Sequence, residues 1–122
     1  MRSKPLQQEL ALFHAEICQA LADSTRIALL YELGDGPKHV SQLVEAVRQP
    51  QPSVSRHLKT LRERGMLSAE RAGGHVVYRL ADPRIVEALD LLRAVMGEIL
   101  ARRERLAEAL REEQEDDAES PA

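Results

Sequence analysis

The chain has 122 residues and a formal net charge of −3, a length that corresponds to about one domain. Its one cysteine excludes an intrachain disulfide framework and is typical of the reducing cytosol. No apolar run approaches the ~20 residues that a membrane span needs. We therefore expect a cytoplasmic protein with no membrane partner, whose core consists of aliphatic side chains because only 2% of the residues are aromatic.

Charge is distributed unevenly along this chain. From Arg48 through Arg79, seven basic residues are opposed by only two acidic ones, Glu63 and Glu70. The last eleven residues, 112–122, hold six carboxylates and no basic residue. A basic middle within an acidic chain indicates a surface that binds nucleic acid.

A first helix is predicted from about Pro5 to Ala22. Five apolar residues recur in it at spacings of three and four, which places them on one helical face: Leu6, Leu10, Phe13, Ile17 and Leu21. A second helix begins after Asp23 or Ser24, either of which can cap it, and ends at the turn 34–37.

A short third helix, about Val40–Val47, is followed by a break at 48–52 that contains two prolines, and then by a fourth helix that ends at Arg64. Val54, Leu58 and Leu61 give the fourth helix an apolar side. Two helices joined by a short turn, of which the second is basic, are typical of a helix-turn-helix.

Two strands are predicted next, Leu67–Arg71 and His75–Leu80, joined by glycines that can adopt positive φ. A hairpin directly after the basic helix forms a wing. A long last helix begins at Asp82 and Pro83, which suit the cap and the first position of a helix. The expected fold is therefore mainly α with a small β-hairpin wing: four helices, two strands and a fifth helix, a winged helix-turn-helix.

Four segments together resemble a known family. Leu-Ala-Asp-Ser-Thr-Arg at 21–26 is similar to the L-A-D-P-T-R signature of the ArsR/SmtB repressors, and Ser53–Arg62 resembles their recognition helix. Residues 65–67 and 71–80 resemble the family's approach to the wing and the wing itself, so the likeness covers about residues 15–99. It implies a homodimeric repressor that binds a palindromic double-stranded DNA operator and is released by an effector.

The fourth helix is expected to contact DNA, because its polar side faces outward when its apolar side is buried. An amide side chain can pair with adenine, short hydroxyls can bond to bases or phosphates, and basic side chains can bind guanine or phosphate. Wing residues are expected to hold minor-groove phosphates. The predicted DNA-binding residues are Gln51, Ser53, Ser55, Arg56 and Lys59 on the helix, and Arg71 and His75 on the wing.

The last helix carries a broad apolar stripe that is longer than a domain of this size can cover, which predicts a homodimer formed jointly with the first helix. The DNA-binding and dimerisation domain is expected to span 1–111, and 112–122 to form an acidic, disordered tail. The predicted interface residues are Leu6, Leu10, Phe13, Leu89, Leu92, Met96 and Ile99.

The effector stays unassigned among a small molecule, a metal and an oxidant. Two metal sites of the family are missing, because Val40–Val47 contains no cysteine and residues 83–113 contain no histidine. We therefore expect no metal and no cofactor. One alternative is a sensor built on His14 and Cys18, which lie one helical turn apart and can supply two metal ligands or a reactive thiol.

No arrangement in the sequence suits catalysis, since no Gly-rich loop joins a strand to a helix and no paired carboxylates line a predicted cleft. We expect no catalytic residues and a regulator rather than an enzyme. A third hypothesis is a dimeric interaction module that does not read DNA. It is favoured by the two prolines before this helix: Pro50 stands where the family often has a Ser or Thr cap, and Pro52 follows it.

Overall fold

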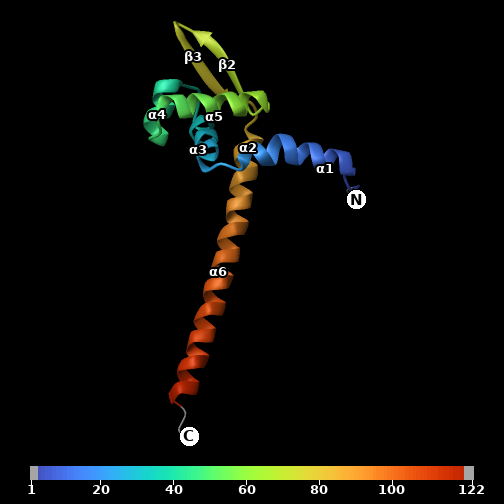
Figure 1. Cartoon of the computed structure of the whole chain (residues 1–122), viewed down its shortest axis with the longest axis vertical. Coiled ribbons are helices and arrows are strands. Elements are labelled where there is room, and N and C mark those ends of the chain that lie inside the picture. Colours follow the sequence, from blue (N-terminus) through green and yellow to red (C-terminus); the bar gives the residue numbers. More distant parts are fainter. Residues whose placement is uncertain (1–2, 120–122) are drawn as a thin grey trace. The chain divides into compact units, whose positions relative to one another are not determined.

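The computed structural model describes residues 3–119. The chain divides into two compact units, residues 1–86 and 87–122. The first unit contains the elements from α1 to β3, and the second contains most of the long helix α6 (Figure 1). Within the described part of the chain, no helix is both long and apolar enough to cross a membrane.

The first helix has the predicted extent but is not uniform. The short α-helix α1, Gln7–Phe13, is followed by η1, a π-helical segment over His14–Cys18, and by α2, Gln19–Leu21. A π-segment widens a helix locally to i→i+5 hydrogen bonds without ending it. The apolar spacing of the sequence therefore predicted where the helix lies but not its widened middle.

The second helix, α3, spans Ser24–Gly34 and begins at the predicted cap. Asp23 Oδ1 accepts hydrogen bonds from the backbone N–H groups of Thr25 at 2.8 Å and Arg26 at 3.1 Å. These groups would otherwise lack partners at a helix start. The bond from the Arg26 N–H is the main cause that lowers the pKa of Asp23 below its usual value.

The helix-turn-helix is formed by α4, Val40–Val47, and α5, Gln51–Glu63, as predicted. Arg48 ends α4 in the left-handed conformation, with φ of 54°. Pro50 precedes α5 and provides no side-chain cap. A proline is tolerated here because the first N–H groups of a helix have no partner within the helix.

The wing is part of a three-stranded antiparallel sheet in the order β1-β3-β2. The hairpin strands β2, Leu67–Ala72, and β3, His75–Leu80, were predicted, whereas β1, Lys38–His39, was not. Ala72 pairs with His75 across a two-residue turn. Gly73 and Gly74 occupy this turn with φ of 57° and 85°, the backbone that a tight hairpin needs.

The core of the first unit lies where α3, α4 and α5 meet the base of the hairpin. The apolar side of α5 is buried as predicted, and three leucines of α3 face the same interior. This packing fixes α5 on one side and leaves its other side to solvent. The buried core residues of this unit are Ala20, Leu29, Leu30, Leu33, Leu43, Val54, Leu58, Leu61, Met66 and Leu67.

The last helix, α6, spans Arg84–Glu119. Its start is capped by Asp82, whose Oδ1 accepts from the Arg84 N–H at 2.9 Å. The side-chain hydrogen bond from Arg84 is the main cause that lowers the pKa of Asp82 to about 2.

The end of α6 differs from the sequence-based expectation of a disordered segment after residue 111, because the helix continues through Glu119. The Glu, Gln and Ala residues that dominate this segment are good helix formers, and Arg111 pairs with Glu108 one turn earlier at 2.6 Å. Residues 120–122 lie outside the described residues. The division of the chain into a domain at 1–111 and a tail at 112–122 stays a prediction.

Candidate nucleic-acid interface

The outer side of α5 carries most of the residues predicted to contact DNA. Gln51, Ser55, Arg56 and Lys59 are exposed, and Ser53 is half-buried in the first turn. The opposite side of the helix is buried, so the helix cannot rotate to present a different set. The N-terminal turn of such a helix is the part that reaches base edges in a major groove.

The basic side chains of α5 differ in how freely they can meet an anion. Lys59 Nζ lies 4.0 Å from Glu63 Oε1, one turn further along the helix. Both side chains are exposed, at 78% and 63%, so water screens this ion pair. Arg56 is exposed near the start of the helix, and no ion pair of the described residues involves it.

The wing presents its two predicted DNA contacts on exposed positions. Arg71 pairs with Val76 across the hairpin, and His75 is the first residue of β3. The His75 ring also stacks on His39, with ring centroids 5.2 Å apart and planes inclined by 23°. His75 is therefore held against the start of α4 rather than projecting freely.

Arg79, the third basic residue of the hairpin, forms an ion pair within the hairpin. Its Nε lies 3.3 Å from Glu70 Oε1 on the neighbouring strand. Arg71 and not Arg79 is thus the hairpin arginine available to a ligand.

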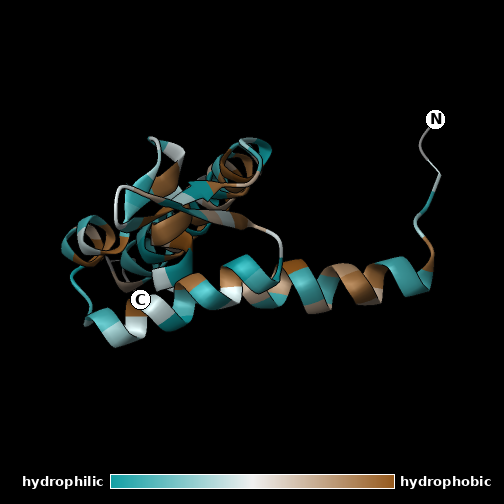
Figure 2. Ribbon diagram, turned by 90° about the horizontal axis from the view of Figure 1, so that it is seen from above, coloured by the Kyte–Doolittle hydropathy of each residue, from teal (hydrophilic) through white to brown (hydrophobic). Residues whose placement is uncertain are grey.

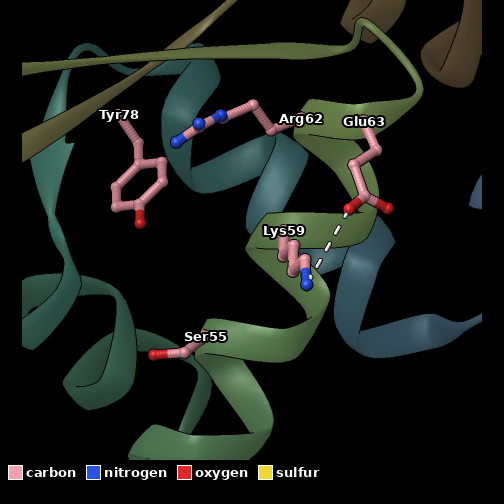
Figure 3. A pocket seen from close by; sticks show the side chains of 5 residues that line it. All are labelled: Ser55, Lys59, Arg62, Glu63 and Tyr78. Carbon is pink, nitrogen blue, oxygen red and sulfur yellow. Dashed lines mark ion pairs between the residues drawn. The ribbon is translucent and has the colours of Figure 1, made fainter.

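A cavity of about 250 Å³ lies between α5 and β3, lined by Ser55, Lys59, Arg62, Glu63 and Tyr78. Figure 3 shows the four side chains of α5 arranged along one flank of the helix, with Tyr78 coming from the sheet. Arg62 and Tyr78 were not among the predicted site residues. The helical spacing from Ser55 to Arg62 was a usable signal for Arg62, whereas Tyr78 reaches the site only through the fold.

Two side-chain contacts connect α5 and the residue that ends it, Arg64, to α3 and η1. Arg26 Nη1 lies 3.2 Å from His57 Nδ1, and Arg64 Nη1 lies 3.0 Å from Glu16 Oε2. Arg26 also donates to the backbone oxygens of Ala20 at 2.7 Å and Gln19 at 3.0 Å. These contacts hold α5 against the start of α3 and against η1, and Arg26 also ties α3 to α2, which fixes the orientation of the exposed side of α5.

The predicted sensor residues, His14 and Cys18, are the first and last residues of η1. His14 is exposed and Cys18 is half-buried. Within the described residues of one chain, no three or more His, Cys, Asp or Glu side chains gather where they could hold a metal ion. Both His14 and Cys18 lie within the predicted first helix, which we expect to take part in the dimer interface.

Six of the seven residues predicted for the dimer interface are exposed in the single chain. On the first helix, Leu6, Leu10 and Phe13 are 71%, 45% and 54% exposed, and hydrophobic positions lie along the helix next to the N-terminus in Figure 2. On α6, the exposed members of the set are Leu92, Met96 and Ile99, whereas Leu89 is buried.

Residues 23–69 match the family described as bacterial regulatory protein, arsR family. The chain is 42% identical over 78 residues to the HTH-type transcriptional repressor SmtB of Mycobacterium tuberculosis, a match that covers 64% of this chain and 58% of that repressor. The chain thus spans less than two thirds of this relative. It is 39% identical over 88 residues to the HTH-type transcriptional regulator NmtR of the same organism, covering 72% of this chain and 73% of NmtR.

A solved structure is similar over most of the chain. The homodimeric winged helix-turn-helix DNA-binding domain of Mb0332 from Mycobacterium bovis superposes with a TM-score of 0.68 at 25% identity. The superposition covers 83% of this chain and 95% of that domain. The elements shared with it include the helix-turn-helix and the wing described above.

Proposed function

The chain belongs to the ArsR family of bacterial regulatory proteins, and from this premise we propose that it is a homodimeric repressor that binds a palindromic operator in double-stranded DNA. Its family relatives are transcriptional regulators, and the proposed role is regulatory rather than enzymatic. It is exerted in the cytoplasm, where the DNA is.

One observation carries this proposal: α5 is buried along one side and presents amide, hydroxyl and basic side chains along the other. In a two-fold dimer, two such helices can enter successive major grooves about 34 Å apart. Gln51 at the start of the helix is suited to a base edge, and Arg56 to guanine or phosphate. The exposed Arg71 of the wing is suited to a phosphate of the adjacent minor groove.

The exposed apolar positions of α1 and α6 support the homodimer. Isolated exposed leucines are ordinary on a protein surface, but a sustained stripe along a helix marks an interaction surface. The Mb0332 domain, which resembles this chain over most of its length, is a homodimer. We therefore assign the stripe to contact between two copies of this chain.

The experiment is selection of bound fragments from a random duplex library by the purified protein, followed by titration of the selected operator. Gln51→Ala and Arg56→Ala are expected to cost about 1–3 kcal/mol each in operator binding. Arg105→Ala on α6 is the matched control, because Arg105 is exposed and lies outside the proposed interface with DNA. If the wild-type protein enriches no sequence, or if the α5 variants enrich the same sequence with the same affinity, the proposal is wrong.

A thiol- or metal-responsive repressor is the second candidate, favoured by the position of His14 and Cys18 at the two ends of the π-helical segment. Such segments occur frequently at functional sites. Cys18→Ser is then expected to retain operator binding and to lose release by oxidant or metal. A release that is unchanged in this variant would leave the effector to another site. The same titrations also test the third hypothesis, a dimeric interaction module that does not read DNA. The double variant Arg56→Ala with Lys59→Ala would leave the activity of such a module unchanged, whereas it would weaken operator binding by a repressor.

A further inference from the structure

We propose that the cavity between α5 and β3 binds one phosphate of the DNA backbone, with Arg62 and Tyr78 as donors that position α5 on the duplex. This inference rests on the proposed function and deepens it. It adds two residues that the sequence pattern of the recognition helix did not single out. The cavity of about 250 Å³ is lined by side chains from a helix and from a strand (Figure 3).

The donors in this cavity match what a phosphodiester offers. A phosphate presents acceptor oxygens only, and Ser55, Lys59, Arg62 and Tyr78 supply two hydroxyls, an ammonium and a guanidinium. The three α5 residues follow one another at spacings of four and three, which keeps them on one flank of the helix. An acceptor-only anion therefore suits these four donors, whereas the major-groove edges of adenine and cytosine offer donors as well.

Tyr78 gives the site a fixed wall, which distinguishes it from a patch of mobile surface cations. It belongs to the central strand of the sheet, where it pairs with Lys38 on one side and Ala69 on the other. Its side chain is half-buried. A phenol held in this way loses little conformational entropy on binding, whereas an exposed lysine loses much more.

The charges in the cavity make Arg62 the main cation for an anion. Lys59 already lies 4.0 Å from the carboxylate of Glu63, which lines the same cavity. Arg62 has no ion pair with any residue in 3–119. Glu63 offsets part of the positive charge of Lys59 and repels a phosphate, so it opposes phosphate binding. The site therefore predicts effects of opposite sign: loss of Arg62 weakens DNA binding, and neutralisation of Glu63 strengthens it.

The position of the cavity assigns it to the backbone rather than to bases. Arg62 lies at the C-terminal end of α5, two helical turns beyond Ser55, whereas bases are reached by the N-terminal turn. Contacts to phosphates set the register of a protein on the duplex and carry no sequence information directly. Arg62 and Tyr78 are accordingly positioning residues, whose loss reduces affinity for every sequence alike.

The test measures the Kd of wild-type protein, Arg62→Met, Tyr78→Phe and Glu63→Gln for the selected operator and for a random duplex, at salt concentrations from 50 to 200 mM. Arg62→Met is expected to weaken both duplexes by the same factor and to reduce the slope of log K against log salt by about 1. Tyr78→Phe weakens both with the slope unchanged, because it removes a hydroxyl and no charge. Glu63→Gln tightens both.

Matched controls separate the outcomes. Arg105→Met removes an exposed arginine of α6 and is expected to match wild type, and circular dichroism checks that all variants are folded. If Arg62→Met behaves as Arg105→Met does, the phosphate site is overturned. If Arg62→Met weakens only the operator, Arg62 reads a base and the backbone assignment is overturned. A wild-type protein that binds both duplexes equally, with a slope that falls in Arg62→Met, would overturn the operator-specific function and keep the site.

A competition experiment with inorganic phosphate tests whether the cavity binds a free anion instead of a phosphate of DNA. At equal ionic strength, phosphate is expected to compete with DNA no better than chloride does, because a single free anion lacks the neighbouring contacts of a duplex. Competition that is specific to phosphate in wild type and lost in Arg62→Met would identify the cavity as a site for a free anion and would overturn the assignment to DNA.

Discussion

The guanidinium of Arg26 and the imidazole of His57 lie 3.2 Å apart, from Nη1 to Nδ1. Arginine has no acceptor, so Nδ1 of His57 accepts this hydrogen bond and the proton of the neutral ring is on Nε2. That atom lies 3.9 Å from Asp23 Oδ1. The start of α3 thus holds the recognition helix through His57, which lies on the flank of the buried side of that helix, and Arg26 also links α3 to α2.

Replacement of Arg26 by methionine tests this link. The variant keeps the length of the side chain but loses the donors to His57 and to the backbone oxygens of Gln19 and Ala20. Hydrogen bonds from charged groups contribute about 1.5–3 kcal/mol each. Arg26 is only half-buried and its bond to Gln19 is exposed, so water replaces part of what is lost, and we expect the free energy of unfolding to fall by roughly 2–4 kcal/mol. Urea denaturation at one fixed protein concentration measures it, because a dimer's stability depends on concentration. A loss no larger than that of Arg105→Met would contradict the structural role.

The cap of α3 makes a prediction about pH. The pKa of Asp23 is lowered in the folded chain, chiefly by the Arg26 N–H, from an ordinary value of 3.8. A lowered carboxyl pKa means that its stabilisation is complete above pH 3.8 and is lost as the pH falls through the lowered value. Asp23→Ala should cost about 1 kcal/mol near neutrality.

Denaturation of wild type and Asp23→Ala at several pH values checks this sign. The difference between their free energies of unfolding should shrink as the solution becomes acidic. Asp23→Asn is the control: its amide oxygen still caps the helix but does not titrate. A gap for Asp23→Ala that stays constant from pH 7 to pH 3 would show that the ionised carboxylate adds nothing to the cap.

Much of this fold follows from local signals in the sequence. Asp23 and Asp82 predicted helix starts correctly, because a short acidic side chain before a helix accepts hydrogen bonds from backbone N–H groups of the first turn. The pair Gly73-Gly74 predicted the hairpin turn, since two consecutive residues with positive φ suit glycine. Each of these signals depends on groups that are close in the sequence.

What the sequence did not predict depends on groups that are distant in the sequence or on small energetic preferences. The strand Lys38–His39 exists because it pairs with β3, and two residues have no periodicity of their own. The π-helical segment His14–Cys18 lies within a longer helix whose apolar spacing in the sequence is that of an α-helix, so the widening leaves no signal in the sequence. Tyr78 lines the cavity beside α5 because of the register of its strand, and this register cannot be read from the identity of the residue.

The wing turn can be tested with a pair of substitutions. Gly73 and Gly74 have φ of 57° and 85°, and no atom lies within 4 Å of a Cβ added at either position. Any penalty is therefore one of backbone conformation and not of space. Asn tolerates the first position of such a turn, so Gly73→Asn should be nearly neutral. Gly74→Val should lower stability by about 1–2 kcal/mol, as measured by thermal or urea unfolding, and equal stabilities would refute the turn's requirement for glycine.

The proposed dimer interface predicts a contrast between neighbouring leucines of α6. Leu92 belongs to the predicted interface and is 62% exposed in the single chain, and Leu91 is 70% exposed but lies about 100° around the helix from it. Leu92→Lys should weaken the dimer by about 100-fold or more, because each copy loses the burial of one leucine. Leu91→Lys should leave the dimer intact. Sedimentation equilibrium measures both, and equal effects of the two lysines would place the interface elsewhere.

Arg103 tests how far this interface runs along α6. Leu89, Leu92, Met96 and Ile99 are followed at the same spacing of three and four by Arg103, and then by Leu106 and Leu110, which are 62% and 52% exposed. Arg103 also lines a shallow hollow on α6 together with Ile99, Arg102 and Leu106. A repeat of this kind is typical of helices that pack against one another, and a single polar residue within it costs stability.

Arg103→Leu should therefore tighten the dimer by about tenfold, since it makes the stripe continuous and buries one added leucine in each copy. Arg105→Leu is the control, because two residues further along the helix the added leucine lies about 200° away from the stripe. Dilution-dependent sedimentation compares the two with wild type. If Arg103→Leu leaves the dimer constant unchanged, the contact ends near Ile99, and the leucines at 106 and 110 face water in the dimer as they do in the single chain.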